Sequence, residues 1–235
     1  MPPAIVFGRA LDYNEATANY ATEACAGPDF PVRLPQQTGG KQMEHPVLQT
    51  IKARRSVRRF LPGQVEEAAL IQILEAGRWA PSGGNSQTSR FFVMQNAQVL
   101  EDLRRRVQSA FSSMEAAPGL YQSIRASIAQ AKRGGYDFCY GAPTLVVAAN
   151  RRDYGNALAD CACALENMML AASALNVGSC WINQLHWLDT HPLVRPYLLE
   201  LGLGEDETVC GGLALGYAAE EPAPPARKGN NVIRL

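Results

Sequence analysis

The sequence carries no excess charge of either sign, because 22 lysines and arginines balance 22 aspartates and glutamates. A general electrostatic attraction to nucleic acid or to an acidic membrane surface is therefore not expected. A long apolar run is also missing, since the longest aliphatic stretch, residues 145–149, is far too short to cross a bilayer. The first residues lack the pattern of a signal peptide, because Asp12 and Glu15 interrupt them. These absences predict a soluble, cytoplasmic protein without a membrane or nucleic-acid partner.

Cysteine is present, but in no redox or metal-binding pattern. The sequence has six cysteines and no CxxC pair; they are Cys25, Cys139, Cys161, Cys163, Cys180 and Cys210. Most of them lie in apolar stretches, which predicts buried, reduced thiols in an intracellular protein. We expect Cys161, Cys163 and Cys180 to form no disulfide and to take no part in catalysis, because no charged neighbour in the sequence lowers a thiol pKa.

The sequence also lacks the common catalytic signatures. It contains no Walker lysine loop and no GxGxxG, GxSxG or HExxH motif, and its three histidines, His45, His186 and His191, are scattered. No hydrolytic triad and no metal site is therefore expected. An enzyme without obvious catalytic side chains fits one in which a bound cofactor carries out the chemistry.

The composition is that of a folded protein, with 47% hydrophobic and 19% charged residues in 235. Residues 1–45 are rich in proline and glycine and have no clear periodicity, so we expect an N-terminal extension before a domain that spans residues 46–235. The patterns in that domain predict helices over residues 46–51, 66–79, 99–114, 121–133, 157–176 and 191–201. They predict strands over residues 90–95, 144–149, 178–183 and 208–217. Helices and strands do not alternate strictly, which favours an α+β fold.

The predicted helix over residues 157–176 is unusual, because fifteen of its twenty residues are apolar. A helix that is apolar all round must be covered on every side, and a chain of this size cannot easily do so alone. Its small residues also permit close approach of another helix. We therefore expect a subunit interface here, with an ordinary central core helix as the alternative.

A basic cluster follows the first predicted helix of the domain, where five of the eight residues from 52 to 59 are lysine or arginine. Guanidinium groups bind phosphate through two parallel hydrogen bonds, and a serine hydroxyl adds a donor. The cluster therefore fits a phosphate site. A solvated helix face and a nucleic-acid patch are the alternatives, and Arg227-Lys228 is a smaller basic pair near the other end of the domain.

A loop of small residues and side-chain amides occupies residues 80–87. Its glycines would let a planar ligand approach the backbone, and its amides can both donate to and accept from the edge of a heterocycle. An ordinary turn at the end of a helix is the alternative interpretation.

Five short segments together carry a pattern that none of them carries alone. They are residues 54–58 (RRSVR), 80–87 (APSGGNSQ), 166–172 (ENMMLAA), 178–183 (GSCWIN) and 214–217 (ALGY), followed by Arg227-Lys228. Over residues 46–230 this order resembles the nitroreductase superfamily. The resemblance implies an α+β fold with a mainly antiparallel sheet flanked by helices. It also implies an intertwined homodimer with two FMN sites at the interface.

The resemblance further implies a role for each matching residue. The phosphate, ribityl chain and pyrimidine end of FMN would be held by Arg54, Arg55, Ser56 and Arg58, with Arg58 as the cation that tunes the flavin. The other subunit would contribute Pro81, Ser82 and Asn85, with Gln87 in the same loop. Backbone groups of Trp181, Ile182 and Asn183 would lie near the isoalloxazine ring, with an N–H close to N5. Arg227 would return to the phosphate.

The activity that the resemblance implies is transfer of a hydride from NADH or NADPH, through the flavin N5, to a nitroaromatic, a quinone or a similar small acceptor. The superfamily also includes specialised dehydrogenases and a deiodinase, so a flavin dehydrogenase or dehalogenase is one alternative. A non-catalytic FMN-binding sensor is another. Thr88 and Ser89 stand where relatives often have proline and an aromatic residue, which predicts a different substrate wall.

Overall fold

The structure is a computed structural model that describes residues 44–229 and 232–234. The expected extension over residues 1–45, and Cys25 within it, lie almost wholly outside the described residues. The described residues form one sheet of four strands, β1 (Arg90–Met94), β2 (Thr144–Arg151), β3 (Gly178–Ile182) and β4 (Glu207–Gly216).

Every neighbouring pair of strands in this sheet is antiparallel, in the order β1-β2-β4-β3. The two central strands, β2 and β4, pair from Thr144 opposite Leu215 to Arg151 opposite Glu207. Residues 144–150 of β2 are buried, because helices cover both faces of the strand. The apolar stretch that predicted a buried strand at 144–149 is therefore confirmed.

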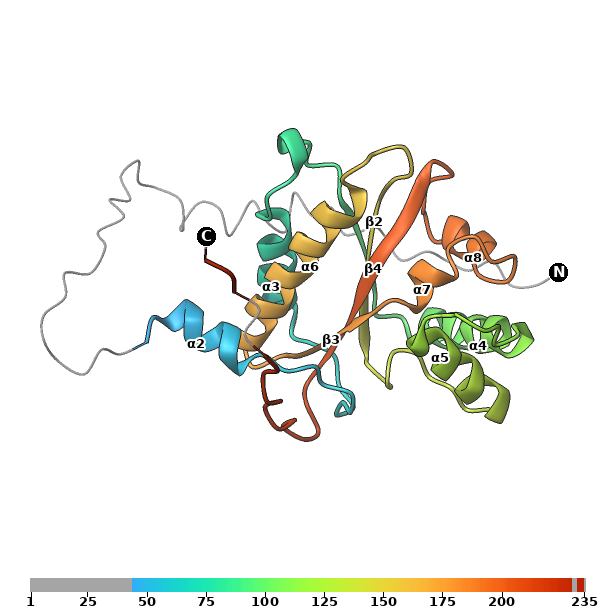
Figure 1. The fold of residues 1–235 in the computed structure, drawn as a ribbon, viewed down its shortest axis with the longest axis horizontal. Coiled ribbons are helices and arrows are strands. Elements are labelled where there is room, and N and C mark those ends of the chain that lie inside the picture. Colours follow the sequence, from blue (N-terminus) through green and yellow to red (C-terminus); the bar gives the residue numbers. More distant parts are fainter. Residues whose placement is uncertain (1–43, 230–231, 235) are drawn as a thin grey trace, which may run out of the picture. The chain divides into compact units, whose positions relative to one another are not determined.

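Helices lie on both faces of the sheet (Figure 1). Their bounds are α2 (Pro46–Ala53), α3 (Glu67–Arg78), α4 (Ala97–Ser113), α5 (Gln122–Arg133), α6 (Ala157–Ala174), α7 (Gln184–Trp187) and α8 (Arg195–Glu200), with a single 3-10 turn, η1, at Gly83–Asn85. Val146 and Leu213 pack with α3 and α6 on one face, whereas Leu145 and Ala214 pack with α4, α5, α7 and α8 on the other. The result is a sheet between two helical layers, each with its own apolar core.

Helices α3 and α6 approach each other closely because Gly77 has no side chain. A Cβ atom at Gly77 would lie 2.1 Å from Cε of Met168, so only glycine allows this packing without movement of the methionine. The sequence predicted that one chain of this size could not easily cover this helix on every side. Within the described residues α6 is indeed partly exposed. Its outer strip, with Ala159, Cys163 and Ala174, is exposed to solvent.

Two further details differ from the sequence-based expectations. The helix expected over residues 191–201 is regular only over Arg195–Glu200, because Pro196 has no N–H to continue a helix that began at residue 191. Helix α7 was not expected, since a single turn of four residues leaves almost no periodic signal. The remaining predicted helices and strands are present, with no end shifted by more than two residues.

Candidate functional site

The basic segment after α2 lies along the edge strand β3. Ser56 forms an isolated parallel bridge with Ser179, and the Val57 N–H donates to the Ser179 carbonyl at 2.9 Å. Gly178 makes this close approach possible, because a Cβ atom there would lie only 3.0 Å from Cγ2 of Val57. The basic segment therefore runs parallel to β3, which contains Trp181 and Ile182 and is followed by Asn183.

The three predicted cations of this segment have different surroundings. Arg54 caps α2 and is half-buried, with its Nε 3.8 Å from a carboxylate oxygen of Glu166. Arg55 folds back onto the end of α2, where its Nη1 donates to the carbonyls of Lys52 and Arg54 at 2.6 and 2.7 Å. Arg58 is exposed, with its guanidinium carbon 5.9 Å from the centre of the Tyr140 ring. Arg54 and Arg58 can therefore still reach a ligand, whereas Arg55 already satisfies helix carbonyls.

The pKa of the Cys180 thiol in β3 is affected by two of these cations. Burial raises the pKa of this thiol, while the positive charges of Arg58 and Arg54 act in the opposite direction and only partly offset the rise. The expectation that Cys180 has no charged neighbour was wrong, although the thiol remains protonated. A negatively charged ligand beside β3 would meet the same two cations.

The end of β3 and the residue after it present polar groups from Trp181 and Asn183. The indole Nε1 of Trp181 donates to Oδ1 of Asn183 at 2.7 Å, and the Asn183 N–H donates to Oε1 of Gln184 at 3.1 Å. Ile182 is only 3% exposed, because its side chain packs in the core. At Ile182 only the backbone can therefore face a ligand.

The loop with Pro81, Ser82, Asn85 and Gln87 lies against the first turns of α6. The Asp160 carboxylate, 6% exposed, accepts the Gly83 N–H at 3.0 and 3.2 Å. The Tyr154 hydroxyl, 2.9 Å from the same carboxylate, also lies 3.0 Å from the Gly83 carbonyl. These contacts fix the loop to α6, so its shape does not depend on a ligand.

Backbone conformation adds to the shape of this loop. Gly84, Asn85 and Gln87 all have positive φ angles, of 59°, 54° and 50°. Asparagine tolerates this left-handed region better than most residues, whereas glutamine rarely adopts it. The Gln87 N–H donates to Oγ of Ser82, and its side chain donates to Oδ1 of Asn85, at 3.0 and 3.1 Å. The amides are therefore held by the loop itself.

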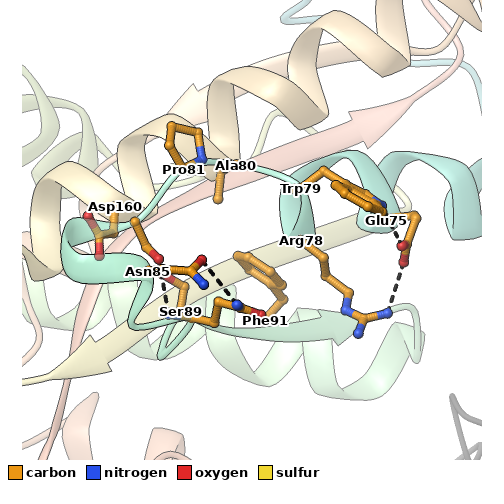
Figure 2. A pocket seen from close by; sticks show the side chains of 13 residues that line it. Glu75, Arg78, Trp79, Ala80, Pro81, Asn85, Ser89, Phe91 and Asp160 are labelled. Atoms are coloured by element: carbon orange, nitrogen blue, oxygen red, sulfur yellow. Dashed lines mark hydrogen bonds and ion pairs between the residues drawn. The ribbon is translucent and has the colours of Figure 1, made fainter. Parts of the chain in front are cut away.

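The described residues form a cavity of about 440 Å³ beside this loop, between α3, β1 and α6. Figure 2 shows Glu75 at one end, bonded to both Arg78 and Trp79, and Pro81, Asn85 and Asp160 at the other. The Trp79 side chain is 78% exposed, which is high for an indole. The cavity has both apolar and hydrogen-bonding walls.

The predicted residues thus form two groups rather than one. Arg54, Ser56 and Arg58 lie beside β3, and Arg54 approaches Glu166 in the middle of α6. The loop over residues 81–87 lies against the first turn of α6 (Figure 1). Arg227 is exposed in the irregular C-terminal arm, whose first residues pair with Phe60 and Arg59 through Ala218 and Ala219.

The five cysteines of the described part are free thiols, and Cys163 is exposed rather than buried. Burial and then Asp137 raise the pKa of Cys139 to about 12. Cys161 and Cys210 share a hydrogen bond, which raises the pKa of Cys210 and lowers that of Cys161. The lowered pKa of Cys161 therefore comes from another thiol rather than from a charge.

Four residues of these networks escaped the sequence analysis: Tyr136, Tyr154, Asp160 and Gln184. Asp160 left a signal, because a carboxylate interrupts an otherwise apolar helix and must find partners when buried. The other three left none, because a single polar residue outside a periodic pattern does not indicate which group it will bond.

Fold and site together define an α+β protein with a group of cations beside an edge strand. The chain belongs to the Nitroreductase family, whose sequence model matches residues 51–217. A nitroreductase from Bacteroides fragilis NCTC 9343, solved with bound FMN, has 40% sequence identity and a TM-score of 0.72, over 81% of this chain and 98% of its own.

Two further relatives are known from sequence. A nitrobenzene nitroreductase of Ectopseudomonas oleovorans is 27% identical over 72% of this chain and 85% of its own length. A protein of Archaeoglobus fulgidus, provisionally named NADH dehydrogenase/NAD(P)H nitroreductase, is 28% identical over 74% of this chain and 86% of its own. The resemblance noted in the sequence and the α+β fold class are both confirmed.

None of the described helices is long and apolar enough to cross a membrane. Among the same residues, no group of three or more His, Cys, Asp or Glu side chains could hold a metal ion.

Proposed function

We propose that the protein is an FMN-dependent oxidoreductase that works as a homodimer and transfers reducing equivalents from NADH or NADPH to a small organic acceptor. Family membership and a 40% identical relative with bound FMN support the cofactor and the class of reaction. The names of the two sequence relatives support a nicotinamide donor and a nitroaromatic acceptor. We also propose that residues 46–235 form the flavin domain and residues 1–45 its extension.

The main observation in support of the proposal is that the basic segment lies alongside β3. An FMN phosphate needs cations and hydrogen-bond donors, and Arg54 and the Ser56 hydroxyl supply both beside one strand, with Arg58 nearby as the cation for the ring. The polar edge of the ring needs donors and acceptors, which the Asn85 and Gln87 amides provide. The chemistry of these groups therefore fits FMN. Arg227 would add a further cation.

When FMN is bound, it supplies the hydride chemistry, accepting from the nicotinamide and donating to the acceptor. The residues of this chain bind it and adjust its electrostatics. Arg58 is the candidate for the cation that stabilises negative charge on the reduced ring. Backbone groups of Trp181, Ile182 and Asn183 would line the ring.

The separation of the two groups of residues supports the homodimer. Within one chain, Asp160 in the first turn of α6 holds the 81–87 loop, whereas Arg54 approaches Glu166 in the middle of the helix, and a second copy would bring one group against the other. The exposed apolar strip of α6 gives that copy a surface to cover. Each site would then combine Arg54, Ser56 and Arg58 of one subunit with the partner subunit's Pro81, Ser82 and Asn85.

The proposal is tested by adding FMN to purified protein and then mixing the holoprotein rapidly with NADH or NADPH without oxygen. We expect about one FMN per chain and loss of the yellow colour within seconds, followed by its return when a nitroaromatic or a quinone is added. Protein that stays colourless after incubation with FMN would contradict the assignment. A flavin that binds but is not bleached would instead favour the sensor.

The specialised dehydrogenase and the dehalogenase share this fold, and a screen of acceptors on the reduced protein separates them from a nitro or quinone reductase. The cytoplasmic location stays a prediction of the sequence.

A further inference from the structure

A chain of hydrogen bonds leaves the proposed flavin site at Asn183 and ends in α5. The Asn183 N–H donates to Oε1 of Gln184, and Nε2 of Gln184 lies 3.0 Å from the Tyr136 hydroxyl. The same hydroxyl lies 2.8 Å from Oγ of Ser127, which is buried. The proposed function uses only the Asn183 end of this chain.

The direction of each bond follows from the donors available. A backbone N–H can only donate, so the amide oxygen of Gln184 must face Asn183 and the amide NH₂ must face Tyr136. The phenolic oxygen of Tyr136 therefore accepts from Gln184. Its own proton remains free to be donated, either to Ser127 or to a bound molecule, because the Ser127 hydroxyl can act as donor in their shared bond.

Packing holds the Tyr136 ring in one orientation. Phe111, which is fully buried, meets it edge to face with the ring centres 6.0 Å apart. The following turn is fixed by Asp137, which accepts the backbone N–H groups of Cys139 and Gly141 at 2.9 and 2.6 Å. A rigid hydroxyl of this kind suits recognition of a ligand atom, because little side-chain entropy is lost on binding.

The turn also borders the basic segment. The Tyr140 ring lies beneath the Arg58 guanidinium, and α7, which carries Gln184, begins directly after Asn183. The Tyr136 hydroxyl thus adjoins the groups that would surround the flavin ring.

We propose that Tyr136, oriented by Gln184, donates a hydrogen bond to an oxygen atom of the acceptor, such as a nitro or quinone oxygen. This inference rests on the proposed function. Tyr136 is then a residue that touches the substrate, whereas Gln184 is a positioning residue that acts through it. The site selects acceptors with an oxygen at the reducible group.

The electrostatics of the hydroxyl agree with this role. Burial raises the pKa of Tyr136, and the hydrogen bonds from Ser127 and Gln184 offset that rise only in part. The group therefore stays protonated at neutral pH and keeps the proton that it would donate.

The test measures binding to the oxidised holoprotein without a nicotinamide, so that no turnover occurs. Nitrobenzene and isopropylbenzene, which have similar shape but differ in their oxygens, are titrated while the visible flavin spectrum is recorded. We expect Tyr136→Phe to weaken nitrobenzene binding about fivefold to tenfold and to leave isopropylbenzene binding within about twofold. Tyr121→Phe is the matched control, because Tyr121 is exposed and packs on the neighbouring Trp187.

Gln184→Glu separates recognition from a merely structural role. A carboxylate at position 184 would still accept a hydrogen bond from the Asn183 N–H. It would also accept one from the Tyr136 hydroxyl, whose proton would then no longer be available to the ligand. We expect this variant to weaken nitrobenzene binding as much as Tyr136→Phe, with flavin content and circular dichroism unchanged. Native affinity in Gln184→Glu, or equal losses for both ligands in Tyr136→Phe, would overturn the inference while leaving the flavin assignment intact. A wild-type protein without FMN would instead overturn the proposed function.

Discussion

Individual arginines in the basic segment are not equivalent, although the sequence presents them as one cluster. Arg55 satisfies two carbonyls at the end of α2, whereas Arg54 and Arg58 keep donors available and act together on Cys180. Among residues 44–229, one carboxylate approaches Arg54, that of the exposed Glu166, at the long distance of 3.8 Å. An incoming phosphate can therefore recruit Arg54 without breaking a strong bond.

Replacing Arg54 by alanine should accordingly weaken FMN binding without unfolding the chain. A charge-assisted hydrogen bond contributes about 1.5–3 kcal/mol, so we expect about a tenfold to hundredfold loss of affinity. The same loss is expected for Arg227→Ala if the C-terminal arm reaches the phosphate. The measurement is a titration of FMN fluorescence, with Arg125→Ala on the exposed face of α5 as the control. Equal affinities in all three variants would exclude a phosphate role for Arg54 and Arg227.

Residue types could be predicted where one segment carries the whole signal. Arg54, Ser56 and Arg58 occur together within five positions, so their chemistry was visible in the sequence. Arg55 appeared equally suitable, because the sequence does not reveal that its side chain turns back onto α2. The bond between Gln184 and Tyr136 was invisible, since it joins residues 48 positions apart.

Among the elements, α6 organises both halves of the site. Near its start, Asp160 holds the 81–87 loop, and further along, Glu166 approaches Arg54. A side chain at Gly83 could not be accommodated in this arrangement, because a Cβ atom would lie 2.7 Å from the Tyr154 hydroxyl. The conformation of the loop therefore depends on Asp160 of α6 and on Tyr154 in the preceding turn, as well as on the loop's own sequence.

Asp160→Ala should loosen the loop and reduce stability. The change leaves the Gly83 N–H and the Tyr154 hydroxyl without their shared acceptor, so we expect a loss of about 1–3 kcal/mol in the free energy of unfolding. FMN binding should weaken as well, because the loop would be less well positioned. Urea unfolding of the apo protein and FMN titration measure the two effects. Asp153→Ala, which removes a surface carboxylate whose side chain is 70% exposed, should leave both stability and FMN binding as in the wild type.

The longer elements could be predicted because their periodicity is strong, as in α3 and α4. The path of the chain between them could not. Sequence gave no indication that residues 56–57 bridge to Ser179, because an isolated bridge has no periodic pattern. It also gave no indication of which strand of the sheet would lie beside the cations, since strand order depends on packing of both helical layers.

For the whole molecule, the dimer is the expectation that most needs a test, and two cysteines of α6 provide a matched pair. Cys163 is exposed in the single chain, whereas Cys161, two positions earlier, is fully buried. We expect Cys163→Glu to fold but to sediment as a monomer with weak FMN binding, because a buried charge at an interface costs several kcal/mol. Cys161→Glu should instead destabilise the chain itself.

Sedimentation velocity and circular dichroism distinguish these outcomes. A native-like dimer with full flavin content in Cys163→Glu would remove the outer strip of α6 from the interface. A wild-type protein that is monomeric and yellow would refute the shared site altogether.

The separation of the arginine segment from the 81–87 loop along α6 also has a genetic consequence in such a dimer. A chain with Arg54→Ala damages the site that uses its own arginines, while a chain with Asp160→Ala damages the site to which it lends its loop. When these two chains pair, both lesions fall in the same site, and the other site receives native residues from each subunit. Two alleles that are each defective alone would therefore complement one another in a cell that expresses both, which two lesions within one self-contained site could not do.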